Sequence, residues 1–306
     1  MRKSLRTSLV ATGAATGLLA LSACGSGITT FEDVTELASV ASASAQEHST
    51  AKFTMEMDMA GMTTTASGEG EFAGADSAMA MTMDTMGSET EMRLVDGVLY
   101  VKASNGGMGM GMGMGMSDDP DKPWVATSIE DSPFVDESMI EQNDPSHTLD
   151  ALAESGEIVE SDFDTELDGE AATYYLIEMD ADKVIEQYVA ELQPEIERGL
   201  GDVEFGTVPV ELWIGENELP LKYTVDIGAV MASMAEHMGE HMPPGMAESS
   251  MTVTYSDWGE PVTVEAPPED EVGEASEMPM GGLDELEELE ELEGIEDLED
   301  FEEMPN

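Results

Sequence analysis

The sequence predicts an α+β fold, in which an antiparallel β-sheet carries helices on one of its faces. The first observation is that about ten segments alternate apolar and polar residues, as strands with one buried and one wet face do. The second is that Asp96-Gly97 and Asp168-Gly169 separate neighbouring segments, and such pairs are typical of hairpin turns. Because hairpins join neighbouring strands, we expect an antiparallel sheet and not a doubly wound parallel one.

The first half of the chain is predicted to begin with a helix and to continue as strands. Residues 31–49 repeat apolar residues at spacings of three and four from Val34 to Ala45, which indicates an amphipathic helix. The period then changes to two, as in the run of methionines after Phe53. The expected strands comprise residues 53–59, 68–72, 79–83, 91–95 and 98–102.

The second half repeats this order of elements. A short helix is expected over residues 146–155, with Ser146 or Asp144 as its cap. A longer helical pattern covers residues 180–200, where Pro194 kinks or ends its strongest part. The expected strands comprise residues 157–167, 171–179, 208–214, 219–227, 251–255 and 262–265.

The first residues have the pattern of a secretory leader. Basic residues precede an apolar stretch from Leu9 to Leu21 that is too short to span a bilayer comfortably. The small residues before Cys24 resemble a bacterial lipobox, which predicts cleavage after residue 23 and a diacylglyceryl, palmitate-type anchor on Cys24. We therefore expect a signal peptide (1–23), a lipidated tether (24–30) and a chain held on the outer face of the cell membrane. The alternative is an ordinary secretory peptide with an incidental cysteine.

The charge balance excludes one class of partner and marks an unusual C-terminus. With 68 acidic residues against 10 basic ones, the net charge is −58, whereas nucleic-acid binding requires clustered Lys and Arg. Residues 269–306 hold 18 acidic residues and no basic one, and their apolar residues recur every third position, which winds around a helix. We expect a disordered acidic tail, which is either a docking segment for an envelope protein partner or a cation collector, or else a solvated spacer.

Several short segments, in this order, resemble a known family. They are Arg93 to Lys102, Lys122-Pro123-Trp124, Val210 to Ile214 with Leu219 to Lys222, and Thr252 to Gly259 followed by Ala266-Pro267. Together with the lipobox and the first helix, they resemble the actinobacterial LppX/LprG lipoprotein family, which has the LolA/LolB-like architecture. The resemblance covers roughly residues 24–268. It implies a strongly curved antiparallel half-barrel whose concave face is covered by helices, with an apolar cavity for acyl chains between them. It also implies transport of lipids or glycolipids across the envelope, and it brings no catalytic motif.

The candidate ligand residues lie on the apolar side of the alternating strands. Met is a flexible and polarisable lining for a ligand of variable shape. The residues alone favour an ordinary filled core, whereas the family resemblance favours a cavity. The candidate cavity residues are Phe53, Met55, Met57, Met59, Met79, Met81, Met83, Leu94, Leu212 and Ile214.

Two further motifs could hold a metal. In the Met-Gly insertion (residues 106–117), Met108, Met110, Met112, Met114 and Met116 alternate with glycine. Their sulfur atoms suit Cu(I), and the alternative is a low-complexity hairpin insertion. The segment from His237 to His241 fits H-x-x-E-H, but Gly239 and two prolines disfavour the helix that a metalloprotease requires. An opportunistic Cu(I) or Zn site and a plain loop or short helix stay open, so no cofactor is predicted.

The sequence therefore predicts a non-enzymatic, membrane-anchored lipoprotein. It carries no G-x-S-x-G elbow, P-loop or G-x-G-x-x-G motif. The predicted function is binding of lipid or glycolipid acyl chains in the apolar cavity of residues 31–268, and their carriage or presentation across the cell envelope. An extracellular Met-rich Cu(I)-binding or buffering lipoprotein is the alternative. A structural envelope protein with a filled core is a third interpretation.

Overall fold

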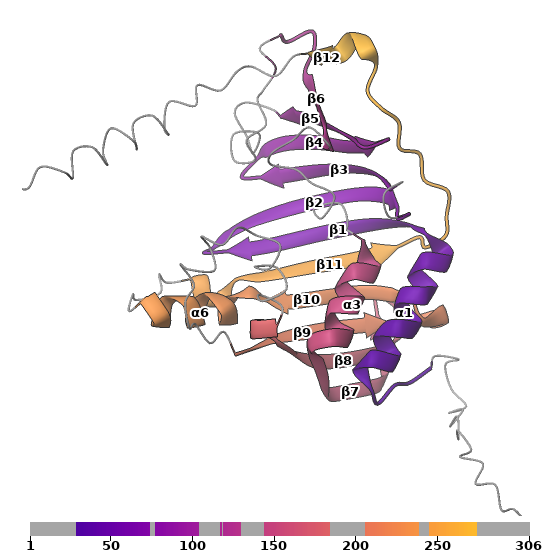
Figure 1. The fold of residues 1–306 in the computed structure, drawn as a ribbon, viewed down its shortest axis with the longest axis vertical. Helices are drawn as coiled ribbons and strands as arrows, with labels where there is room; N and C mark the ends of the chain where they lie inside the picture. Colours follow the sequence, from indigo (N-terminus) through magenta and orange to yellow (C-terminus); the bar gives the residue numbers. More distant parts are fainter. Residues whose placement is uncertain are drawn as a thin grey trace, which may run out of the picture.

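The computed structural model describes residues 29–73, 77–103, 117, 119–129, 144–183, 206–238 and 245–273. They form a mixed α/β structure around one 12-stranded sheet with the order β12-β6-β5-β4-β3-β2-β1-β11-β10-β9-β8-β7 (Figure 1). All neighbouring strands are antiparallel except β12 and β6, which are parallel. The predicted antiparallel sheet is therefore confirmed.

The sheet consists of two meanders that meet where β1 pairs with β11. The first meander comprises β1 (Thr50–Met59), β2 (Met62–Glu71), β3 (Ala78–Thr85), β4 (Ser88–Val95), β5 (Val98–Ala103) and β6 (Trp124–Ser128). The second comprises β7 (Gly156–Leu167), β8 (Glu170–Asp180), β9 (Thr207–Ile214), β10 (Pro220–Asp226) and β11 (Ser250–Ser256). A short 3-10 turn, η4 (Glu216–Glu218), joins β9 to β10.

The two predicted Asp-Gly hairpins are present. Asp96 and Gly97 have φ angles of 51° and 71°, and Asp168 and Gly169 have 52° and 89°. Both turn residues are left-handed, as in the two-residue turn whose twist matches the strands. The β1–β2 and β3–β4 turns also have positive φ at both positions, although Ala60 and Met86 occupy the first one. The sequence gives no strong turn signal at these two hairpins.

Two helices pack against one face of the sheet and confirm two predictions. α1 (Val34–His48) and α3 (Pro145–Ser155) lie together in front of the second meander (Figure 1). The Asp33 side chain caps α1 by accepting a hydrogen bond from the Glu36 amide at 2.9 Å. Asp144, not Ser146, caps α3, because its carboxylate accepts from the Ser146 amide at 2.9 Å. None of the helices in these described ranges combines the length and the apolar character needed to cross a membrane.

A third helix replaces the end of a predicted strand. β10 ends at Asp226, and α6 (Ile227–Met238) begins at the next residue, where the sequence predicts strand up to residue 227. The Asp226 carboxylate accepts a hydrogen bond from the Ala229 amide at 3.3 Å, which explains why the helix starts there. The turn η5 (Met246–Glu248) leads from this region into β11. Of the predicted helix 180–200, residues 181–183 are helical, and the remainder from 184 lies outside the described residues.

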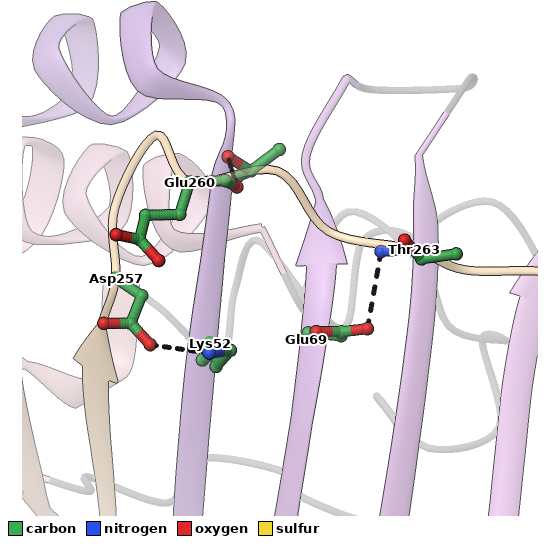
Figure 2. Close-up of polar contacts among 6 residues, drawn as sticks. Lys52, Glu69, Asp257, Glu260 and Thr263 are labelled. Atoms are coloured by element: carbon green, nitrogen blue, oxygen red, sulfur yellow. Dashed lines mark hydrogen bonds and ion pairs between the residues drawn. The ribbon is translucent and has the colours of Figure 1, made fainter.

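The segment after β11 is extended but is not the predicted strand 262–265. Gly259 donates from its amide to the Thr50 carbonyl at 2.9 Å. Thr263 donates from its amide to the Glu69 carboxylate at 3.4 Å, as Figure 2 shows. Arg93 then donates to the Glu265 carbonyl at 3.1 Å. These contacts hold residues 257–268, the C-terminal strap, across one end of the first meander. The strap leads into η6 (Glu269–Glu271) and β12 (Val272–Gly273), so the sheet extends beyond residue 268.

The core lies between the two helices and the second meander, together with β1. Leu37 and Ala41 of α1 and Leu152 of α3 are buried against Ile177, Leu212 and other sheet residues. The composition, with 5% aromatic residues, predicts a core of aliphatic side chains and Met with few rings. Aliphatic side chains do predominate in the main cluster, but methionines pack against it from half-buried positions instead of filling it. Among the described residues, the buried apolar side chains include the rings of Phe31, Phe53, Trp124, Tyr175, Tyr223 and Tyr255 but a single methionine, Met92.

Candidate functional site

All ten candidate cavity residues lie on the same face of the sheet. Residues directly opposite each other in a register share a face, and each strand alternates between faces. One register row runs from Phe53 through Gly68 and Met81 to Met92 and Val101. A second row joins Leu212, Tyr223 and Val253 to Met55. This face is the one that α1 and α3 pack against, since Leu212 and Ile214 share a buried cluster with both helices.

Burial divides the ten residues into two groups. Leu212 is 1% exposed and Ile214 is 0% exposed, because the helices cover them. Phe53 and Leu94 are also buried, so these four residues belong to the packed core. The six methionines are half-buried and form what we call the Met-lined patch, which comprises Met55, Met57, Met59, Met79, Met81 and Met83.

Strand β2 separates the two strands of the Met-lined patch with small residues. On this face it places Ala66 between Met55 and Met83, and Gly68 between Phe53 and Met81. The Phe53 ring lies over Gly68, because a Cβ atom built there would be 2.7 Å from the Phe53 ring. The patch is therefore built of long, flexible thioethers on either side of a strand that is small at Ala66 and Gly68, and this strand adds Met62 opposite Met59 at its end.

An aromatic cluster borders this face near the start of β1. The ring centroids of Phe72 and Trp258 are 6.4 Å apart, those of Trp258 and Tyr255 5.3 Å, and those of Tyr255 and Tyr223 6.3 Å. Burial raises the pKa of Tyr255 well above its usual value, and the Tyr223 hydroxyl and the Asp144 carboxylate add to this effect. Periodicity along the chain does not predict this cluster, although Tyr255 and Trp258 both lie in the segment from Thr252 to Gly259 that resembles the family.

The opposite face of the sheet is polar. Two grooves in the described part, of about 470 and 440 Å³, lie mainly on this side and share Thr54, Ser67 and Thr82. Hydroxyl groups and charged side chains line them, so neither groove is the apolar cavity that the family resemblance implies.

Four basic residues of this polar face have partners within the sheet or the strap. Lys52 pairs with Asp257 at 2.8 Å, and Lys102 pairs with Glu91 at 2.6 Å (Figure 2 shows the first pair). The hydrogen bond that the Lys52 ammonium donates to the Asp257 carboxylate raises the pKa of Lys52. Arg93 lies 4.8 Å from the centroid of the Trp124 ring. Lys222 lies 4.6 Å from the centroid of the Trp213 ring.

The candidate metal ligands and the lipidation site are not part of this geometry. Cys24, Met108, Met110, Met112, Met114, Met116 and His241 lie outside the described residues, as does the side chain of His237. Within the described ranges, no group of three or more His, Cys, Asp or Glu residues could hold a metal ion. The copper alternative therefore stays a prediction.

Neither a protein-family model nor a curated protein sequence matches the chain. Solved structures do match. The lipoprotein LppX of Mycobacterium tuberculosis is 13% identical, with 76% of this chain and 98% of that chain covered and a TM-score of 0.45. LprF from Mycobacterium bovis is 14% identical, with coverages of 76% and 96% and a TM-score of 0.44. Both are mycobacterial lipoproteins of the family that the sequence resembles. At this identity, function has to be argued from the residues of the chain itself.

Proposed function

We propose that the protein is a non-enzymatic lipoprotein that binds the acyl chains of a lipid or glycolipid against the Met-lined patch. Its Cys24 anchor would hold it on the outer face of the cell membrane. There it carries or presents the lipid to another membrane or envelope protein.

The observation that carries this proposal is the uneven cover of one apolar face. Over the second meander, α1 and α3 bury this face, and Leu212 and Ile214 have almost no exposed surface. Over β1 and β3 the same face continues as half-buried methionines. Contact between these six thioethers and water is unfavourable. An acyl chain that covers them would remove this apolar surface from water and so would bind favourably.

The energies are sufficient for a transferable ligand. Apolar burial contributes about 0.8 kcal/mol per CH₂ group, so a chain of about 16 carbons could supply on the order of 10 kcal/mol. Immobilising the ligand offsets several kcal/mol of that gain. The net binding free energy that remains is enough to hold the lipid in water and to release it at a membrane, as a carrier requires.

The first test is to identify what the protein holds after purification. A leaderless, soluble form with Cys24→Ser is extracted with organic solvent and examined by mass spectrometry, with metal analysis of the same sample. We expect co-purifying lipid. Stoichiometric copper without lipid would contradict the proposal and favour the Cu(I)-binding alternative.

A pair of adjacent substitutions tests the location of the ligand. Met81 and Thr82 are neighbours on β3. The Met81 side chain lies on the apolar face, and the Thr82 side chain lies on the polar face. Met81→Glu should remove most of the bound lipid, because an acyl chain cannot solvate a carboxylate. Thr82→Glu is the matched control and should retain it. Equal lipid content in both variants would place the ligand elsewhere.

A further inference from the structure

Methionine is distributed unevenly between the core and the half-exposed part of the apolar face. Among the described residues, the fully buried apolar side chains include one methionine, Met92. The fully buried positions under α1 and α3 are filled by Ala, Leu, Ile, Val and aromatic residues, and Met55, Met79 and Met81 pack against them from half-buried positions. The Met-lined patch, by contrast, is methionine at every large position of β1 and β3 after Phe53.

This placement matters because the thioether is a chemically reactive side chain. A peroxide or hypohalous acid transfers one oxygen atom to the sulfur, which is oxidised to a sulfoxide. With a peroxide, the O–O bond breaks, the S–O bond forms and the oxidant leaves as water or an alcohol. No other bond of the methionine changes, and the product side chain is polar.

We propose that the Met-lined patch is a methionine-oxidation site through which extracytoplasmic oxidants switch off ligand binding without unfolding the protein. The predicted loss of ligand binding rests on the proposed function. The predicted selectivity of oxidation rests on the burial pattern of the methionines. The patch is accessible to small oxidants because its six methionines are half-buried. The core is protected because its side chains, Met92 excepted, carry no thioether.

Two effects follow from oxidation of the patch. Ligand binding should weaken at least about tenfold, because each sulfoxide in the contact places an unpaired polar oxygen against an acyl chain. The fold should persist, since the fully buried members of the main cluster, such as Leu37, Ile177 and Leu212, carry no thioether, and Met55, Met79 and Met81 pack against them only from half-buried positions. Bound lipid should in turn protect the patch from oxidation.

The test uses the soluble Cys24→Ser form, hydrogen peroxide as oxidant and a fluorescent long-chain fatty acid as the binding probe. Peptide mass spectrometry locates the sulfoxides, and near-UV circular dichroism reports the fold. One variant replaces Met79, Met81 and Met83 by Leu, a change of similar volume. The control is Met86→Leu, because Met86 is 79% exposed in the β3–β4 turn and outside the patch.

We expect peroxide to weaken probe binding in the unmodified chain and in Met86→Leu, and to have a smaller effect on the triple variant. Unchanged binding by a chain with confirmed patch sulfoxides would overturn the inference. So would loss of the folded spectrum in parallel with oxidation. If the untreated chain does not bind the probe, the proposed function fails. In that case, sulfoxides in the patch but not at Met92 would still support the patch as an oxidation site. Oxidation of Met86 alone would contradict it.

Discussion

Gly68 is the residue on which the arrangement of β1, β2 and β3 depends most closely. A Cβ atom at this position would lie 2.4 Å from the Ala80 carbonyl oxygen, 2.7 Å from the Phe53 ring and 3.1 Å from the Met81 Cα atom. Two of these three neighbours are backbone atoms, which cannot move aside without disturbing the β2–β3 pairing. The strand therefore tolerates no side chain here, whatever its polarity.

We predict that Gly68→Ala lowers the free energy of unfolding by about 1–3 kcal/mol, as overpacking in a filled site does. Gly70→Ala, on the same strand and face, is the control. Its Cβ atom would meet its nearest neighbours at 3.4 Å, which is ordinary contact, so a change below about 1 kcal/mol is expected. Urea denaturation of both variants measures the difference. Equal losses would show that steric overlap at Gly68 is not the cause.

Tyr255 should make stability depend on alkaline pH. Its pKa is raised in the folded chain by burial, so between the unfolded pKa near 10 and the higher folded value the native state holds one more proton. The stabilisation is complete below pH 10 and is lost as the pH rises further, by up to about 1.4 kcal/mol per pH unit.

We predict that Tyr255→Phe reduces this alkaline slope when denaturation is measured between pH 8 and 11. A smaller slope should remain, because burial also raises the pKa of Tyr175. Tyr100→Phe, at a half-exposed position, is the control and should keep the full slope. A slope that is the same in all three proteins would contradict the assignment.

At the scale of elements, α1 begins where a carboxylate satisfies its first turn. Asp33 is the cap, and the following turns bury Leu37, Ala38 and Ala41 against the sheet. We predict that Asp33→Ala costs about 1 kcal/mol in the free energy of unfolding, because the Glu36 amide loses its acceptor. Asp33→Asn retains an acceptor oxygen and should cost only a few tenths of that. Thermal denaturation of the two variants distinguishes loss of the cap from loss of charge.

The elements with local signals are the ones that sequence reasoning predicts. The periodicity of α1 and α3, the alternation of β1 and β3 and the two Asp-Gly turns all depend on neighbours within a few residues. Of the two misses, one has a non-local cause and the other is a local ambiguity. The strap after β11 has the composition of a strand, but its hydrogen bonds go to the side chain of Glu69 and to Arg93 across several strands. α6 begins at a cap whose acceptor, Asp226, also fits the end of a strand.

The candidate site shows the same limit. Alternation correctly assigns the ten candidate residues to one face, because period two fixes the face. It cannot tell the buried Leu212 from the half-buried Met81, since that difference depends on where α1 and α3 pack. Burial by distant elements is a tertiary property and leaves no mark in a strand's own pattern.

At the scale of the whole molecule, the acidic excess should oppose folding at low ionic strength. The chain has a net charge of −58, and the carboxylates of its folded part repel one another, a repulsion that is relieved when the chain expands. Raising the ionic strength from 0.01 to 0.15 M shortens the screening length from about 30 to 8 Å. We predict that the melting temperature rises by several degrees over this range. An uncharged solute at matched osmolality is the control, and an unchanged melting temperature in salt would contradict the argument.

The pairing of β1 with β11 has a consequence for the order in which the chain folds. Lys52 and Asp257 face each other across this junction although they are 205 residues apart in the chain. Each meander can pair with itself as it emerges, but the centre of the sheet cannot close until residue 256 is available. In a chain made from its N-terminus, the two halves of the sheet therefore cannot join before synthesis has passed β11.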